Sequence, residues 1–312
     1  MHKERRCIMI KIAFFGEAMQ ELNDEHVLRF GGDVYNTAVY FKRLAPQADA
    51  QFVSAIGIDE ISQAAQTLWR QQGLSLSFVQ TSTDKTLGRY GITTDSHGER
   101  KFCYARSDSA AKQFFQLDTQ HNFIESLRTT HFSHCYLSAI SLAILDTANR
   151  QLLLDVLDDF KRAGGKVIFD SNYRSVLWQS EQATPFYLTA YKLADYLFVT
   201  DDDHHGVFGQ CNEKELVSFY QQFTNKLVII KQGVADTLVL NNKEIQRFTV
   251  QKAEHVVDTT SAGDAFSAGF LATYLYSHNT QQAISTAQQV ALQVIAQKGA
   301  IVPTTIQIAN EG

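Results

Sequence analysis

The sequence predicts an α/β protein with a mostly parallel central sheet. Apolar, β-branched runs alternate along the 312-residue chain with segments of helical periodicity. The runs are continuously apolar, which is typical of strands that helices cover on both faces. Only 3 prolines occur, and no linker or repeat interrupts the chain, so we expect one α/β domain over residues 1–312.

The expected elements follow one another in a regular order. Helical patterns at 36–44, 61–74 and 148–165 separate the apolar runs, and a further apolar stretch at 270–277 predicts a late helix. Strands are predicted at 10–16, 51–57, 131–140, 166–170, 196–200 and 226–233. In such sheets ligands bind beyond the carboxyl ends of the strands, so the residues that follow each strand are the candidates for chemistry.

Two segments, about 17–32 and 86–107, break this order. Within the second, RYGITTDSHGERKFCYAR alternates around a Ser96-His97-Gly98 turn and predicts a hairpin with one exposed face. We expect both segments to form a small β lid beside the main body. An exposed edge or face on this lid favours a homodimer formed through the lids.

Composition narrows the class of protein. The chain is 45% hydrophobic and 20% charged, as in ordinary globular proteins. Its net charge of −5, without a basic run beyond HKERR, argues against a nucleic-acid partner. The first residues show no cleavage pattern and are interpreted as a leader into the first strand, and no window is apolar enough to span a membrane. The 4 cysteines form no CxxC pair, which argues against zinc and disulfides and favours a cytoplasmic location.

The segment DTTSAGDAFSAG, residues 258–269, lies where a loop is expected to enter a helix. Such a junction presents free backbone N–H groups and the positive end of the helix dipole. Gly263 lets the backbone approach a ligand, and Asp264 would lie inside the resulting phosphate site. An ordinary helix start with a first-turn aspartate explains the same residues.

The segment FGGDVYNTAVYF contains a glycine pair, Gly31 and Gly32, that permits close approach of a ligand. Asn36 is expected to open a helix and offers hydrogen bonds to a polyol. A plain turn with Asn36 as the helix cap is the alternative.

The segment CYARSDSAA places Tyr104 and Arg106 two residues apart, on one face of a strand. With Tyr90 on the facing strand, the lid would carry two phenols and one guanidinium above the cleft. A bidentate arginine suits a carboxylate ligand. The alternative is an exposed ribbon with a solvated arginine.

The segment VIFDSNYRSVLW places Asp170, Asn172 and Arg174 at alternating positions after a buried strand. Such groups are costly to bury without partners, which favours a ligand site over packing. An internal salt bridge between Asp170 and Arg174 is the alternative.

Three acidic residues, Asp201, Asp202 and Asp203, follow the strand at 196–200. They suit water-mediated binding of Mg²⁺, and a charged helix N-terminus explains them equally well. His204 and His205 lack a third ligand at zinc spacing and are expected at the surface.

The two glycine-containing segments resemble the signatures of a known family. GGDVYNTA is similar to the N-terminal motif of ribokinase-like, PfkB-type carbohydrate kinases, and DTTSAGDAFSAGF to their C-terminal motif. The resemblance extends from about residue 10 to 303, although Ser261 stands where the family usually has glycine. No GxxxxGK[ST], GxGxxG, GxSxG or HExxH motif offers another family. The resemblance implies a ribokinase-like three-layer sandwich that uses ATP and Mg²⁺.

Within that family, GEAMQEL, YARSDSAA, YLSAISLAI and FDSNYRSVLW are similar to segments of 2-keto-3-deoxygluconate kinases. This resemblance implies transfer of the ATP γ-phosphoryl group to O6 of the sugar acid, giving 2-keto-3-deoxy-6-phosphogluconate and ADP. The two arginines favour such an acidic substrate. The alternatives are a family member that acts on fructose, ribose or a nucleoside, and a sugar sensor without catalysis.

The resemblance also implies a role for individual residues. Asp264 corresponds to the catalytic base, and Ser261, Ala262 and Gly263 correspond to an anion hole. Substrate contacts are expected at Gly32, Asn36, Tyr90, Tyr104, Arg106 and Arg174, and ATP contacts at Asn172, Thr200, Lys231, Gly233 and Gly263. Thr200 and Asp203 fall on a degenerate NxxE motif, which makes Asp203 the candidate for magnesium. Whether a monovalent cation is required stays open.

Overall fold

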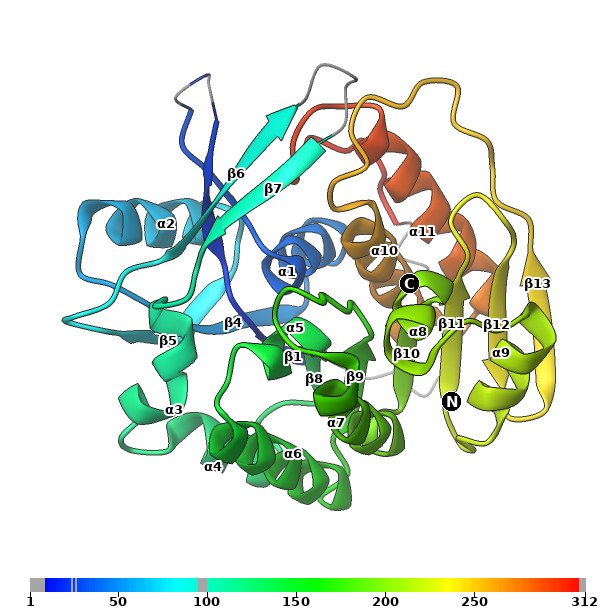
Figure 1. Ribbon diagram of the computed structural model, residues 1–312, viewed down its shortest axis with the longest axis horizontal. Helices are drawn as coiled ribbons and strands as arrows, with labels where there is room; N and C mark the ends of the chain where they lie inside the picture. Colours follow the sequence, from blue (N-terminus) through cyan, green and yellow to red (C-terminus); the bar gives the residue numbers. More distant parts are fainter. Residues whose placement is uncertain (1–8, 24, 26, 95–99, 309–312) are drawn as a thin grey trace, which may run out of the picture.

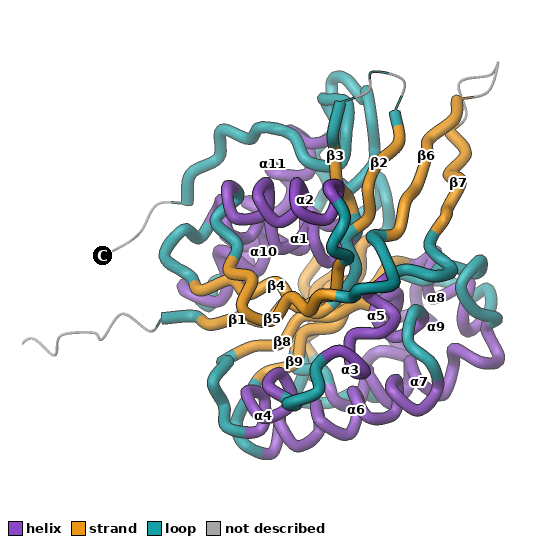
Figure 2. Tube along the Cα trace, turned by 90° about the vertical axis from the view of Figure 1, so that its left-hand side faces the viewer, coloured by secondary structure: helices purple, strands orange, loops and turns teal. Residues whose placement is uncertain are grey.

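The first strand, β1 (Lys11–Phe15), supplies side chains to two separate cores. Ile12 and Phe14 pack into one hydrophobic core, and Ala13 and Phe15 pack into the other. Successive side chains of a strand point to opposite faces, so a continuously apolar strand requires cover on both sides. The computed structural model, which describes residues 9–23, 25, 27–94 and 100–308, has this layered arrangement throughout (Figures 1 and 2).

The central sheet has nine strands in the order β13-β12-β11-β10-β9-β8-β1-β4-β5. All pairs from β5 to β11 are parallel, and β12 and β13 run antiparallel at one edge. The strands after β1 are β4 (Asp49–Ile56), β5 (Ser75–Thr81), β8 (His134–Ser138), β9 (Lys166–Asp170), β10 (Tyr196–Thr200), β11 (Leu227–Lys231), β12 (Thr237–Asn241) and β13 (Glu244–Phe248). The predicted mostly parallel sheet is confirmed.

Helices cover both faces of this sheet. One face carries α1 (Asp33–Leu44), α2 (Glu60–Gln71), α10 (Ala262–Ser277) and α11 (Thr280–Ile295). The other carries the short helices η1 (Ala110–Gln113), α3 (Phe114–Leu117), α4 (Asn122–Arg128) and α5 (Ala139–Ala143), followed by α6 (Thr147–Arg162), α7 (Ser180–Leu193), α8 (Asp201–Phe208) and α9 (Glu213–Gln221). Figure 2 shows the two helical layers on opposite sides of the strands. The predicted three-layer sandwich is confirmed.

A separate four-stranded sheet, called the small sheet below, has the order β3-β2-β6-β7. Its strands are β2 (Met19–Leu22), β3 (Arg29–Gly31), β6 (Gly88–Thr94) and β7 (Arg100–Ala105). These strands lie in the two segments that interrupt the α/β order, and Figure 2 shows them projecting from one edge of the molecule. The expected Ser96-His97-Gly98 turn and the leader at 1–8 lie outside the described residues.

Ten of the sixteen residues of helix α10 are buried. It packs closely on α11, and a Cβ on Gly269 would lie 2.9 Å from the Cα of Ala287. The contact at Gly269 therefore sets how closely α10 and α11 approach each other.

Within the described ranges no helix, α10 included, has the length and apolar character that a membrane crossing needs.

We expect Gly269→Ala to lower the free energy of unfolding by about 1–3 kcal/mol, because the added methyl group overlaps the backbone of α11. Urea denaturation measures this loss. Gln289→Ala, on the exposed side of α11, is the control and is expected to stay within about 0.5 kcal/mol of the parent. An unchanged urea midpoint for Gly269→Ala would contradict the prediction, because it would mean that α10 and α11 move apart without a loss of stability.

Candidate active site

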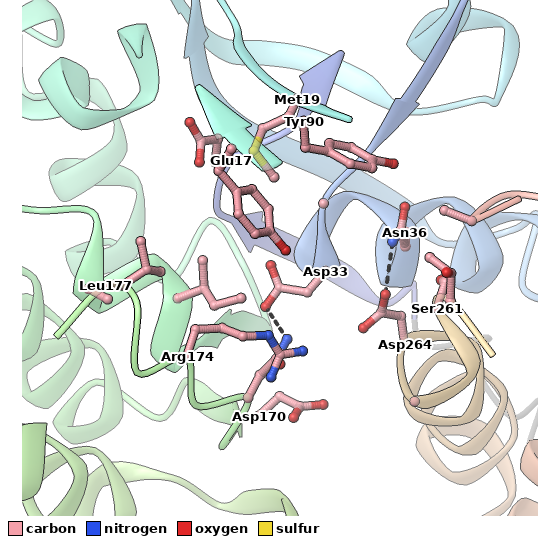
Figure 3. Close-up of a pocket in the computed structure, with 18 of the residues that line it drawn as sticks. Glu17, Met19, Asp33, Asn36, Tyr90, Asp170, Arg174, Leu177, Ser261 and Asp264 are labelled. Atoms are coloured by element: carbon pink, nitrogen blue, oxygen red, sulfur yellow. Dashed lines mark hydrogen bonds between the residues drawn. The ribbon is translucent and has the colours of Figure 1, made fainter. Parts of the chain in front are cut away.

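A cavity of about 1260 Å³ opens where the parallel strands end, beside the small sheet. The last residues of three adjacent strands line it, namely Asp170 of β9, Thr200 of β10 and Lys231 of β11. The starts of α1 and α10 and several side chains of the small sheet complete the lining (Figure 3). The carboxyl ends of parallel strands meet at one edge, so polar residues far apart in the sequence converge here.

Asp264 lies in the first turn of α10, at the helix start that the sequence predicts. Its Oδ2 accepts a hydrogen bond from Nδ2 of Asn36, 2.8 Å away. Burial beneath the cavity and the nearby charge of Asp33 raise the pKa of Asp264 to about 7, although the Asn36 hydrogen bond opposes this shift. A carboxylate with a pKa near neutrality suits proton transfer.

Ser261 precedes α10 with φ 65°, in the left-handed region. A residue with a Cβ is disfavoured in this conformation by roughly 1 kcal/mol, a cost that glycine would avoid. Ala262 and Gly263, which follow, both line the cavity. The Ala262 N–H donates to the carbonyl oxygen of Thr259 at 3.2 Å, whereas the Gly263 N–H is a first-turn group without a partner in the helix ladder. A Cβ on Gly263 would lie 3.6 Å from Nζ of Lys231, so that ammonium group stands directly beside the helix start.

Asp170 is buried at the end of β9 and has three partners. Its Oδ2 accepts hydrogen bonds from Tyr136 Oη at 3.2 Å and Ser267 Oγ at 3.0 Å, and Nζ of Lys231 lies 3.4 Å away. The suggested salt bridge between Asp170 and Arg174 is therefore wrong, because Lys231 takes the place of the arginine.

Arg174 points into the cavity from the loop after β9 (Figure 3). Its Nη1 donates to the carbonyl oxygen of Tyr173 at 2.7 Å and lies 3.9 Å from Oδ1 of Asp203. The side chain is 48% exposed. Its positive charge is thus available to a ligand in the cavity.

The small sheet brings its three predicted residues together. Tyr90 and Tyr104 face each other in register, with ring centroids 6.4 Å apart, and both line the cavity with Arg106. The guanidinium of Arg106 lies 6.0 Å from the centroid of the Tyr104 ring. The hydroxyl of Tyr90 donates to Glu21 at 2.7 Å.

Arg106 forms a buried ion pair with Glu17, the second residue after β1. The alternative of a solvated arginine is therefore wrong. Glu17 was not among the predicted site residues, although an acidic residue just beyond the end of a buried strand is itself a signal for a site at the sheet edge. Because Glu17 balances the charge of Arg106, this arginine brings little net positive charge to a ligand.

The start of α1 differs in detail from the prediction. The helix begins at Asp33, so Asn36 lies in its first turn and does not cap it, and the cap position belongs to Gly32. Gly32 has φ 151°, and a Cβ there would collide with the carbonyl oxygen of Glu17. The sequence analysis overlooked Asp33, which lines the cavity and accepts a hydrogen bond from Nδ2 of Asn172 at 2.7 Å.

The acidic run after β10 forms the charged first turn of α8. Thr200 caps this helix by accepting from the Asp203 N–H at 3.0 Å. Both carboxylate oxygens of Asp203 accept internal hydrogen bonds, from Ser171 Oγ at 2.7 Å and Tyr173 N–H at 2.8 Å, and burial raises its pKa. These bonds leave Asp203 poorly placed to ligate a metal directly, and its role toward magnesium stays a prediction.

Two further residues lie apart from the cavity lining. Gly233 occupies the turn after β11 with φ 59° and is outside the lining. His204 is buried against Phe219, with ring centroids 4.8 Å apart, so the expected surface position is wrong. Among the residues that the structure describes, no group of three or more His, Cys, Asp or Glu side chains is arranged to hold a metal ion.

The chain is similar to known proteins over most of its length. The model of the pfkB family carbohydrate kinase matches residues 4–307. A 2-dehydro-3-deoxygluconokinase of Dickeya dadantii is 38% identical over 303 residues, which cover 94% of this chain and 96% of that protein. The enzyme of the same name from Escherichia coli K12 is 37% identical, with 94% and 97% covered. The crystal structure of a Thermotoga maritima 2-dehydro-3-deoxygluconokinase, 20% identical, superposes with a TM-score of 0.77 over 94% of this chain and 95% of that one.

The raised pKa of Asp264 predicts a pH-dependent stability. Between the ordinary aspartate pKa of 3.8 and about 7, the folded protein binds a proton that the unfolded chain releases, so stability falls as pH rises. We expect Asp264→Asn to be more stable than the parent at pH 8 by on the order of 2 kcal/mol, and to lose most of this advantage by pH 5.

Urea denaturation of the ligand-free protein at both pH values measures this effect. The exposed acid Asp155 on α6, changed to Asn, is the control for removal of one negative charge. An advantage of equal size at pH 5 and pH 8 would contradict the raised pKa.

Proposed function

Because the chain belongs to the pfkB family of carbohydrate kinases, we propose that it transfers the γ-phosphoryl group of ATP to O6 of 2-keto-3-deoxygluconate, also called 2-dehydro-3-deoxygluconate. The products are 2-keto-3-deoxy-6-phosphogluconate and ADP. The observation that carries the proposal is the position of Asp264, a carboxylate with a pKa of about 7 beside a helix start, with an exposed arginine across the same cavity.

Asp264 acts as the general base. Its carboxylate accepts the proton of the O6 hydroxyl while the bond from O6 to the γ-phosphorus forms and the bond to ADP breaks. Asn36 holds the carboxylate in place through the 2.8 Å hydrogen bond. A general base contributes about 10² to 10⁴ in rate.

The start of α10 stabilises the charge on the transferred group. The backbone N–H groups at Ser261, Ala262 and Gly263 form the anion hole, and the helix dipole and Lys231 add positive potential. These groups are in place before the reaction, so they need no reorganisation during transfer.

ATP binds at the ends of β10 and β11, with contacts from Asn172, Thr200, Lys231, Gly233 and Gly263. The divalent ion enters as part of the substrate Mg·ATP, where it neutralises phosphate charge. The internal hydrogen bonds of Asp203 support this assignment, because they leave the nucleotide phosphates and water as the main ligands of the ion. A monovalent cation is not part of the proposal.

The sugar acid lies between Asp264 and Arg174, with Gly32, Tyr90, Tyr104 and Arg106 around it. Arg174 is the group that meets the substrate carboxylate, since Glu17 already balances Arg106. A kinase for fructose, ribose or a nucleoside would have no anionic group to place against Arg174. A sensor without catalysis would not need Asp264 as a base.

We further propose that the protein is a cytoplasmic homodimer in which the small sheet serves as a lid. Leu22, Val27 and Leu28, on and beside β2 and β3, are exposed apolar residues that a second lid would cover. The net charge of −5 supports small-molecule partners over nucleic acid.

A substrate panel tests the function. ADP release with Mg·ATP is measured for 2-keto-3-deoxygluconate, its galactonate epimer, fructose, ribose and adenosine. We expect turnover on the keto acids alone, and Asp264→Asn serves as the variant that retains ATP binding with turnover lower by about 10² to 10⁴. Turnover confined to a neutral sugar would contradict the proposal that the substrate is acidic. Turnover on none of the five compounds would contradict the proposal that the protein is a kinase for any of them.

Arg174→Ala tests the carboxylate contact. Loss of a charge-assisted hydrogen bond worth about 1.5–3 kcal/mol raises KM for the sugar acid by roughly tenfold or more, while KM for ATP stays within about twofold. Arg174→Lys keeps the charge without the bidentate geometry, so its KM for the sugar acid is expected to lie between the values of the parent and of Arg174→Ala. Arg162→Ala, on the exposed side of α6, is the matched control. An equal rise in both KM values would contradict the assignment.

A further inference from the structure

Asp33 is a charged residue of the cavity that the mechanism above leaves without a role. It is the first residue of α1 and lies three positions before Asn36. Residues at this spacing share one face of a helix, and both side chains line the cavity. Asn36 donates a hydrogen bond to Asp264, so Asp33 lies about one helical turn from the residue that positions the base.

The position of Asp33 is held by a second element. Nδ2 of Asn172, from the loop after β9, donates to its Oδ2 at 2.7 Å. Figure 3 shows the Asp33 side chain facing the cavity, with Arg174 on one side and Asn36 with Asp264 on the other. A carboxylate therefore occupies the middle of the path between the basic end and the base end of the cavity.

The proposed substrate has a matching order of groups. Its reacting O6 hydroxyl lies at one end, its carboxylate at the other, and the C5 and C4 hydroxyls lie between them. With O6 at Asp264 and the carboxylate at Arg174, the middle hydroxyls face Asp33. A carboxylate accepts hydrogen bonds from hydroxyls, so Asp33 is chemically suited to contact them.

We propose that Asp33 is a specificity-determining residue that accepts a hydrogen bond from the C4 hydroxyl and so distinguishes 2-keto-3-deoxygluconate from its galactonate epimer, an inference that rests on the proposed function. The two sugar acids differ in the orientation of this one hydroxyl. The disfavoured epimer turns the hydroxyl away and leaves a partly buried carboxylate oxygen without that partner. Sites that hydrogen-bond a substrate hydroxyl discriminate strongly for this reason.

A purely structural role for Asp33 is the competing explanation. An acidic residue in the first turn of a helix interacts favourably with the helix dipole wherever it lies. That role affects folding and does not depend on which epimer is bound. Glu60, the exposed first-turn acid of α2, has only the structural role and provides the matched control.

Asp33 has a second measurable effect because its charge is felt by the base. In the described part of the chain, the titratable groups that interact electrostatically with Asp264 include Asp33 and Tyr40 on α1, Tyr136 on β8 and Asp170 at the end of β9. The ammonium group of Lys231 lies beside the neighbouring Gly263. Burial makes the largest contribution to the raised pKa of Asp264. The charge of Asp33 makes the next largest, and the charge of Asp170 makes a smaller one. Removal of its charge lets Asp264 ionise at lower pH.

The test measures kcat/KM for both epimers, KM for Mg·ATP, and the acid limb of the pH profile. We expect Asp33→Asn to lower kcat/KM for the preferred epimer by about tenfold or more, to reduce the preference between epimers, and to move the acid limb to lower pH. Asp33→Glu keeps the charge but shifts the oxygens by one methylene, so it reduces the preference and leaves the acid limb in place. Glu60→Gln changes none of these values.

A cooperative thermal transition well above the assay temperature and a KM for Mg·ATP close to that of the parent show that each variant is folded. Equal losses on both epimers in Asp33→Asn, or an unchanged preference, overturn the inference while the proposed function stands. A parent enzyme that phosphorylates neither epimer overturns the proposed function, and the inference falls with it.

Discussion

The hydrogen bond between Asn36 and Asp264 joins two helix starts that lie 228 residues apart in the sequence. Helices α1 and α10 share one face of the sheet, and their N-termini converge at the edge where the parallel strands end. The bond holds the carboxylate of Asp264 at a point where two helix dipoles favour negative charge and where burial opposes it. These opposing effects give a group that takes up and releases a proton near neutral pH. The other residues of the cavity act around this carboxylate.

Two ion pairs fix part of the charge that lines the cavity. Glu17 pairs with Arg106, and Asp170 pairs with Lys231. Each pair joins different elements, so the charged groups are positioned by the fold before any ligand binds. Arg174 differs, because it is half exposed and bonds mainly to a backbone carbonyl. Arg174 thus adds an adaptable cation to a framework of fixed charges.

The sequence predicted the layered fold and most of the cavity, and its errors have physical causes. Continuous apolar strands require cover on both faces, so the layers followed from pattern alone, as did the place of Asp170 at the end of its strand. Thr200 and Lys231, at the ends of the neighbouring strands, were assigned through the family resemblance. Pairing between distant side chains does not follow from pattern, because it depends on how elements pack. That limit explains why Lys231 rather than Arg174 meets Asp170, and why Glu17 and Asp33 were overlooked. His204 is a polar residue, but the aromatic residues of α9 bury it. The sequence around His204 does not indicate this burial, because α9 is a separate element.

The two outer strands of the central sheet differ in composition from the inner ones. Strand β13, EIQRF, is exposed over most of its length and carries Glu244 and Arg247, and β5, SLSFVQT, is rich in serine and other polar residues. An uncovered strand edge is a template for further strands, and charged or polar side chains hinder that addition. The sheet thus ends at both sides in strands that resist self-association. The inner strands can therefore be strongly apolar without presenting an apolar edge to other molecules.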